Sequence, residues 1–148
     1  MLKLKDIMTA DLVSAGPQAT LREAMELLSE QHISGVPVVS GAKVVGVFTA
    51  TDLLDFLAEH DETSGSLGVG RRSRTHLDEV MVSEVMTRTV HSLPPECSVE
   101  EASAFMRQAQ IHRVLVMKGG ALLGIVTTTD VAKAVADHLI GRRTYVFS

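Results

Sequence analysis

Residues 46–52 read GVFTATD, and residues 124–130 read GIVTTTD, 78 positions further along the chain. The same spacing, without a gap, relates Ile7-Met8-Thr9 to Val85-Met86-Thr87, Pro17 to Pro95, and Val36 to Val114. A gapless series of this length indicates an internal repeat. The repeat constrains the fold more strongly than any single local pattern.

Each copy predicts the order strand, helix, strand, strand, helix. Thr20 with Glu23, and Ser98 with Glu101, have the spacing of a capping box at the start of the first helix. The expected strands are 12–14, 36–39 and 44–48 in the first copy, and 90–92, 114–117 and 122–126 in the second. Glycines at 41, 119 and 120 are expected at the hairpin turns. Asp52 and Asp130 are expected to be the N-caps of the last helices.

These elements predict an α/β (α+β) fold, in which two pseudo-symmetric β-α-β-β-α repeats pack through their sheets into one compact module. We expect repeat 1 at 1–60, a linker or loop at 61–75, repeat 2 at 76–140 and a C-terminal tail at 141–148. The linker is rich in Gly and Ser and ends in Arg71-Arg72-Ser73-Arg74, which is either a solvated loop or a segment that folds over an anionic ligand. The tail has strand-like residues and two arginines.

Composition excludes several classes of function. The formal net charge is −4 and aromatic residues make up 3%, which argues against nucleic-acid binding and against anionic membranes. The start of the chain has no apolar signal-peptide core, and one cysteine, Cys97, fits a reducing compartment, so we expect a soluble, cytoplasmic protein. No spacing suggests a catalytic triad, a metal cluster or a phosphate loop, so we expect no enzyme.

The ordered set of motifs resembles the CBS domain, the regulatory module named after cystathionine beta-synthase, occurring twice. The resemblance is carried by residues 46–52 and 124–130, by 33–39 (ISGVPVV) and 111–116 (IHRVLV), and by the opening Met-Thr pairs. It implies tandem repeats, frequent dimers of the pair, and regulatory binding of AMP, ADP, ATP or S-adenosylmethionine. No cofactor is implied beyond such a ligand.

An adenosine ligand needs an acceptor for its ribose hydroxyls, and an aspartate at a helix start provides a carboxylate there. By the resemblance, the phosphate end meets residues before the first hairpin strand of the other repeat, which gives two inter-repeat clefts. The first would combine Asp130 and Thr127 with Thr9, Val13, Ser34 and Gly35. The second would combine Asp52 and Thr49 with Thr87, His91, His112 and Arg113.

The two clefts are predicted to differ in ligand. The guanidinium of Arg113 can bind a phosphate with two parallel hydrogen bonds, and His112 adds charge near neutral pH. We therefore expect the Asp52 cleft to prefer more phosphorylated ligands, and the Asp130 cleft to suit AMP or an uncharged adenosine moiety.

Each of these residues also has a purely structural interpretation. Asp52 and Asp130 could be helix caps alone, His112-Arg113 a solvated strand start, and His91 a surface residue. Ser34 could satisfy nearby backbone groups, Met8 and Met86 fill the core, and Cys97 packs rather than reacts.

The leading functional hypothesis is therefore a regulatory adenine-nucleotide sensor that signals to an effector protein in trans, with a homodimer expected. The alternative is a ligand-free dimerisation scaffold. Nucleic-acid binding is the third hypothesis, and catalysis is the hypothesis with the least support.

Overall fold

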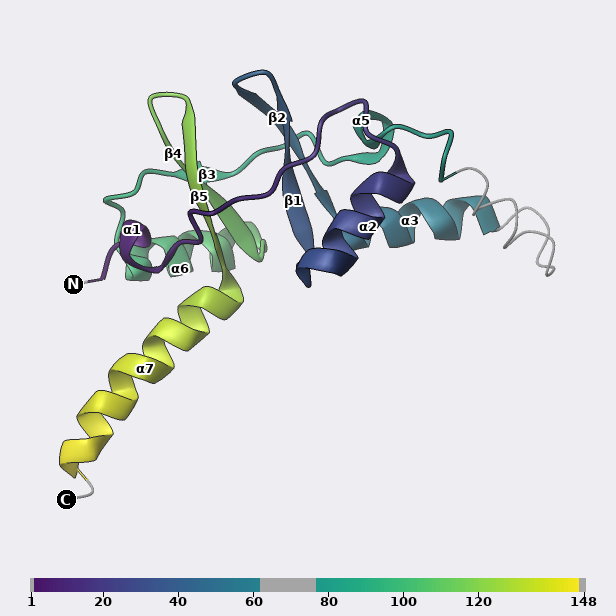
Figure 1. Cartoon of the computed structure of the whole chain (residues 1–148). Coiled ribbons are helices and arrows are strands. Elements are labelled where there is room, and N and C mark those ends of the chain that lie inside the picture. The colour runs from purple at the N-terminus through teal and green to yellow at the C-terminus, as the bar shows by residue number, and fades with distance from the viewer. Residues whose placement is uncertain (1, 62–76, 147–148) are drawn as a thin grey trace. The chain divides into compact units, whose positions relative to one another are not determined.

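The computed structural model describes residues 2–61 and 77–146, and it is a mixed structure of helices and small sheets (Figure 1). Its contacts divide the chain into two compact units. One comprises Val13–Val90 and is called here the Asp52 unit. The other comprises Met1–Leu12 with His91–Ser148 and is called the Asp130 unit. Each unit is described by itself.

The Asp52 unit is built on a β-hairpin with helices around it. Its elements are α2 (Leu21–Gln31), β1 (Gly35–Ser40), β2 (Lys43–Thr49), α3 (Ala50–Asp61) and α5 (Val82–Val85). Strands β1 and β2 are antiparallel, with Gly35 opposite Thr49 and a bulge after Val38. Consecutive residues of both hairpin strands and the inner face of α2 are buried, and the hydrophobic core contains Leu21, Ala24, Leu28, Val36, Val38 and Phe48.

The Asp130 unit repeats this plan with an extra strand. Its elements are α1 (Leu4–Ile7), β3 (Ser92–Leu93), α6 (Val99–Ala109), β4 (Arg113–Lys118), β5 (Ala121–Thr127) and α7 (Thr128–Val146). Strand β4 pairs in parallel with β3 and antiparallel with β5. Leu4, Ala102, Met106, Val114, Val116 and Val126 form its core.

The predicted N-caps of the first helix of each repeat are confirmed, but only Thr20 and Glu23 form the complete capping box. Thr20 and Glu23 make both bonds of a capping box: the Thr20 N–H donates to Glu23 Oε1 at 2.9 Å, and the Glu23 N–H donates to Thr20 Oγ1 at 3.1 Å. The Ser98 hydroxyl accepts from the Glu101 N–H at 3.0 Å and donates to the Glu101 carboxylate, also at 3.0 Å. The hairpin turns lie at the predicted glycines, where Gly41 has φ +62° and Gly119 φ +60°.

Two details of the prediction are wrong. Helices α3 and α7 begin at Ala50 and Thr128, so Asp52 and Asp130 lie in the first turn rather than at the N-cap. Residues 12–14 form no strand. The nearest pairing is a single parallel bridge between Ala15, the next residue, and Val38. In the second repeat the short strand is Ser92–Leu93.

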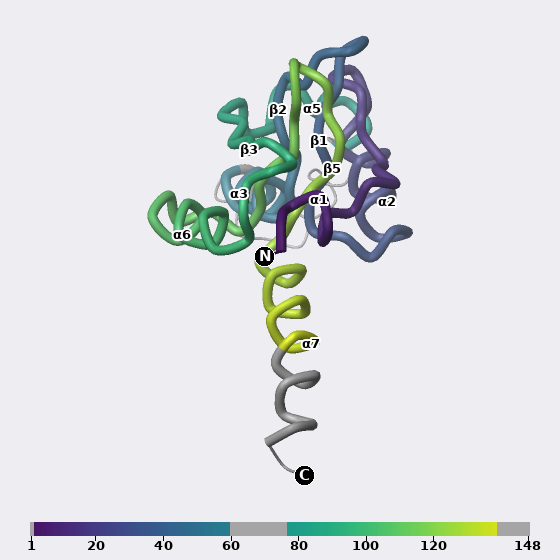
Figure 2. The backbone as a smooth tube through the Cα atoms, turned by 90° about the vertical axis from the view of Figure 1, so that its left-hand side faces the viewer, coloured from purple at the N-terminus to yellow at the C-terminus, as the bar shows by residue number. Residues whose placement is uncertain are grey.

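The opening segment of each repeat packs on the hairpin of the other repeat. In the Asp130 unit, Thr9 bridges Ile125 of β5, and α1 contacts β5 and α7. Figures 1 and 2 both show this purple N-terminal segment beside the green strand β5. In the Asp52 unit, Thr87 bridges Val47 of β2 in the same way. The compact units are therefore assembled from both sequence repeats.

The predicted linker and the predicted C-terminal tail follow repeat 1 and repeat 2, respectively. Arg71-Arg72-Ser73-Arg74 lies outside the described residues. The backbone of the predicted tail continues α7 as helix up to Val146, although its composition is strand-like. None of the helices in the described part of the chain combines the length and the hydropathy that a membrane span requires.

Candidate nucleotide-binding site

The start of α3 holds Thr49 and Asp52 in a reciprocal cap. The Thr49 N–H donates to Asp52 Oδ2 at 2.9 Å, and the Asp52 N–H donates to Thr49 Oγ1 at 3.1 Å. Threonine is thus the N-cap and the aspartate occupies the third helical position, where a carboxylate also interacts favourably with the helix dipole. The cap holds the Asp52 carboxylate at the helix start.

Thr87 is brought to this carboxylate by a backbone bridge. The Thr87 N–H and the Val47 N–H each donate to the other residue's carbonyl at 2.9 Å. The bridge requires a glycine beside it, because a β-carbon on Gly46 would lie 2.8 Å from the Thr87 carbonyl oxygen, which the bridge holds in place. So placed, the Thr87 hydroxyl donates to Asp52 Oδ1 at 2.9 Å. We call Thr49, Asp52 and Thr87 the Asp52 cluster.

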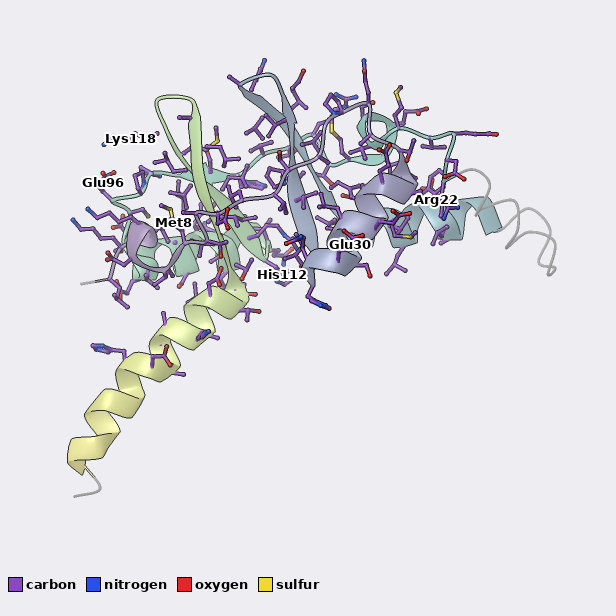
Figure 3. The ribbon with its side chains drawn as sticks, viewed as in Figure 1. Met8, Arg22, Glu30, Glu96, His112 and Lys118 are labelled. Carbon is purple, nitrogen blue, oxygen red and sulfur yellow. The ribbon has the colours of Figure 1, made fainter. Side chains whose placement is uncertain are left out.

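The Asp130 unit builds the equivalent cluster from Thr9, Thr127 and Asp130. The Thr127 N–H donates to Asp130 Oδ2 at 2.8 Å, and the Asp130 N–H donates to Thr127 Oγ1 at 3.2 Å. Thr9 exchanges two backbone hydrogen bonds with Ile125, of 2.9 and 3.1 Å. Figure 3 shows Met8, the preceding residue, beside the β4–β5 hairpin, where its sulfur packs against Gly124. We call Thr9, Thr127 and Asp130 the Asp130 cluster.

Both carboxylates are reachable. Asp52 and Asp130 are half-buried, whereas Thr9 and Thr87 are exposed. Thr49 and Thr127 are half-buried as well. Each cluster therefore presents a charged acceptor and hydroxyl groups to solvent, the kind of group that binds a sugar diol.

Three further predicted residues lie in the Asp52 unit. Val13 packs against the hydrophobic core, and Gly35 is buried opposite Thr49. The Ser34 carbonyl accepts from the Ala50 N–H at 2.9 Å, so Ser34 lies beside the start of α3.

The remaining three predicted residues lie in the Asp130 unit. Arg113 begins β4 opposite Thr127, and the His112 carbonyl accepts from the Thr128 N–H at 2.9 Å. The His91 ring packs edge-on against Phe105, with centroids 5.9 Å apart. His91 is thus half-buried against α6 in addition to being a candidate for ligand contact.

A hollow adjoins the last helix in each unit. In the Asp52 unit a volume of about 480 Å³ is lined by α3 and α5, including Asp52, Phe56 and Glu84. In the Asp130 unit a volume of about 460 Å³ is lined by α6 and the start of α7, including Met106, His112 and Thr128. Each volume falls in the range of small-molecule sites.

Groups that could carry other chemistry are few in the described part of the chain. There, no cluster of three or more His, Cys, Asp or Glu side chains could hold a metal ion. Burial, together with the nearby charge of Glu101, raises the pKa of the Cys97 thiol, which makes it a poor nucleophile at neutral pH. Cys97 packs against the core of its unit.

Sequence reasoning missed the role of the threonines as N-caps. The signal was present, because Thr-x-x-Asp at 49–52 and 127–130 has the same spacing as Thr20 with Glu23. The close packing of Met86 on Gly46 was also missed, since it joins residues 40 positions apart and has no local signature.

Comparison with known proteins matches this architecture. The family model for the CBS domain matches residues 4–59 and 82–137. The CBS domain-containing protein YhcV of Bacillus subtilis is 30% identical over 132 residues, which cover 89% of this chain and 84% of YhcV. The crystal structure of CBSX2 in complex with AMP superposes with a TM-score of 0.74 and 26% identity, covering 93% of this chain and 98% of CBSX2.

Some relatives are much longer. An inosine-5'-monophosphate dehydrogenase of Korarchaeum cryptofilum is 32% identical over 122 residues, but these cover 82% of this chain and only 22% of the dehydrogenase.

Proposed function

The chain belongs to the CBS-domain family, and from that premise we propose that it is a regulatory module that binds an adenine nucleotide through its Asp52 and Asp130 clusters. The observation that carries the proposal is the repeated Thr-x-x-Asp cap, which holds a half-buried carboxylate at the start of α3 and again at the start of α7. The AMP complex of CBSX2 supports adenosine as the common part of the ligand.

The chemistry of each cluster suits a ribose. The vicinal hydroxyls of the sugar are two donors in fixed geometry, and a carboxylate accepts such bonds strongly because it is charged. The adjacent threonine hydroxyl, Thr49 or Thr127, both donates and accepts. Thr9 and Thr87 flank the carboxylates from the opening segments, and Val13, Ser34, Gly35 and His91 complete the predicted contacts.

The phosphate end is assigned to His112 and Arg113 with the Asp52 cluster. A guanidinium and an imidazole favour a ligand with more negative charge, so ATP or ADP is proposed there. The Asp130 cluster has no such cation among its assigned partners, and AMP or an uncharged adenosine moiety is proposed for it.

Regulation follows if the ligand binds two conformations of the chain unequally, because equal affinity would shift no population. We propose that the chain works in the cytoplasm as a homodimer that signals to an effector protein in trans, without catalysis and without a resident cofactor. The match to the dehydrogenase covers only 22% of that enzyme, which supports a regulatory module rather than that enzyme's chemistry.

A thermal-shift panel tests the proposal. AMP, ADP, ATP and S-adenosylmethionine are added separately to the full chain and to the Asp52→Asn/Asp130→Asn double variant. A ligand at about 100 times its dissociation constant stabilises by about 2.7 kcal/mol, which corresponds to a rise in Tm of about 5–10 °C. We expect a rise for at least one ligand that the double variant loses. No response to any of the four would contradict nucleotide binding and leave the ligand-free dimerisation scaffold as the function.

A further inference from the structure

The two clusters distribute their hydrogen bonds differently, although their sequences match. In the Asp52 cluster, Oδ2 of the carboxylate accepts from the Thr49 N–H and Oδ1 accepts from the Thr87 hydroxyl, both at 2.9 Å. In the Asp130 cluster, the Thr127 N–H and hydroxyl both donate to Oδ2, at 2.8 and 3.1 Å. Within residues 2–61 and 77–146, nothing donates to Asp130 Oδ1.

The hydroxyls of Thr49 and Thr127 also differ, in whether they donate a hydrogen bond to the aspartate. The Thr127 hydroxyl donates its hydrogen bond to Asp130. The Thr49 hydroxyl accepts from the Asp52 N–H and, among the described residues, donates to no protein acceptor. The Asp130 cluster therefore offers an open charged acceptor, whereas the Asp52 cluster offers an open donor beside a carboxylate that already has a partner on each oxygen.

The source of the difference is the hydroxyl contributed by the opening segment. Thr9 and Thr87 are both anchored by a backbone bridge to the neighbouring strand, at equivalent positions of the repeat. The Thr87 hydroxyl reaches its carboxylate, but the Thr9 hydroxyl makes no hydrogen bond within the described part of the chain. The Thr87 hydroxyl thus occupies one of the two lone pairs of Asp52 Oδ1, so a second donor must share that oxygen or displace Thr87.

We propose that Thr87 sets the sugar selectivity of this protein, an inference that rests on the proposed nucleotide binding. A ribose hydroxyl that binds Asp52 replaces or shares an existing hydrogen bond, so removing that hydroxyl from the ligand changes the affinity little. At Asp130 the same hydroxyl fills an empty charged acceptor. The Asp130 cluster therefore selects ribonucleotides, and the Asp52 cluster tolerates 2'-deoxyribonucleotides.

The expected loss of affinity on removing the ribose hydroxyl differs between the Asp130 cluster and the Asp52 cluster. A hydrogen bond to a charged group that is gained without losing another changes an equilibrium constant by about tenfold or more. An exchange of one hydrogen bond for another leaves a change of about threefold or less, because the two bonds largely cancel.

Calorimetric titration with AMP and with 2'-deoxy-AMP tests the proposal. The Asp52→Asn variant leaves the Asp130 cluster intact, and there we expect AMP to bind at least about tenfold more tightly than 2'-deoxy-AMP. The Asp130→Asn variant leaves the Asp52 cluster intact, and there we expect a ratio of about threefold or less.

Two matched substitutions identify Thr87 as the cause. Adding Thr87→Val to the Asp130→Asn variant removes the competing hydroxyl and keeps the backbone bridge, so the AMP preference should rise to about tenfold. Adding Thr89→Val, at an exposed threonine two residues further along the chain with no assigned role in the site, to the Asp130→Asn variant should leave its ratio unchanged. Equal ratios in the two single variants, or a ratio that Thr87→Val does not raise, would overturn the inference while leaving nucleotide binding in place. If the unsubstituted chain binds neither nucleotide, this inference falls, and the proposed function falls with it only if ADP, ATP and S-adenosylmethionine also fail to bind.

A ligand-free measurement checks the competing bond itself. In a double-mutant cycle of urea unfolding, Thr87→Val and Asp52→Asn should be coupled by about fivefold in the unfolding equilibrium constant. Thr9→Val and Asp130→Asn should be additive. Additive effects for the first pair would show that the Thr87 hydroxyl does not compete, and would overturn the inference without reference to any ligand.

Discussion

A β-carbon on Gly124 would lie 2.6 Å from Met8 Sδ and 2.9 Å from the carbonyl oxygen of Thr9. Gly46 has the same relation to Met86 and to the Thr87 carbonyl, at 2.7 and 2.8 Å. These contacts let the opening segments pack against the strands, where Thr9 bridges Ile125 and Thr87 bridges Val47, and in the Asp52 unit they bring the Thr87 hydroxyl to Asp52. The glycines are therefore part of the site, although neither can touch a ligand with a side chain.

Gly46→Ala and Gly124→Ala should each destabilise the chain by about 1–3 kcal/mol, the usual cost of overpacking a tight contact. The methionine side chain can move aside, but the backbone carbonyl cannot move without breaking the bridge. Urea unfolding measures the change. Gly16→Ala is the control, since nothing lies within 4 Å of a β-carbon there and it should shift stability by about 0.5 kcal/mol or less. Equal small effects at all three glycines would contradict the close packing.

Ser98→Ala should cost about 1–2 kcal/mol, because Ser98 is 4% exposed and its hydroxyl caps α6. Removing it leaves the Glu101 N–H without that acceptor and removes the hydroxyl's own bond to the Glu101 carboxylate. Thermal unfolding compared with Ser14→Ala, a substitution at an exposed position, isolates the cap. Identical Tm values for the two variants would show that the cap contributes nothing.

Arg113→Ala should weaken ATP binding by about tenfold or more and AMP binding much less, because the guanidinium is assigned to the outer phosphates. Lys5→Ala removes a positive charge from an exposed position on α1 of the same unit, away from the hollow beside His112, and serves as the control. Calorimetric titration with both nucleotides provides the comparison. An ATP affinity equal to that of the unsubstituted chain would remove Arg113 from the site.

Cys97 should react slowly with a disulfide reagent in the folded chain. Burial raises the pKa of its thiol, so less of the reactive thiolate is present at a given pH. The midpoint of the rate against pH should lie above that of the urea-unfolded chain, where the thiol has its ordinary pKa. A folded-state midpoint at or below the unfolded value would indicate an activated cysteine instead.

The fold was largely predictable because its signals are local and occur twice. Thr20 and Glu23 predict the start of α2, and Gly41 and Gly119 mark the turns. The four hairpin strands fall within one residue of their predicted ends, since buried Val and Leu residues define them. The start of α3 differs from the prediction because threonine and aspartate are both favoured N-cap residues, and Thr49 precedes Asp52 by three positions.

The arrangement of the site was less predictable. The contact between Met86 and Gly46 depends on a chain path of many residues, and single residues such as Gly or Met do not encode it. The hydrogen bond from Thr87 to Asp52, and its absence between Thr9 and Asp130, separates two clusters whose sequences are equivalent. Such differences arise from side-chain geometry within each unit. A repeat pattern in the sequence is the same for both units and does not contain this information.

The stoichiometry of nucleotide binding tests the function most directly. AMP is titrated calorimetrically into the unsubstituted chain, into Asp52→Asn, into Asp130→Asn and into the double variant, at equal protein concentration. Two carboxylate clusters predict about two sites per chain, about one in each single variant and none in the double variant. An unchanged stoichiometry and affinity in the double variant would show that neither carboxylate holds the nucleotide.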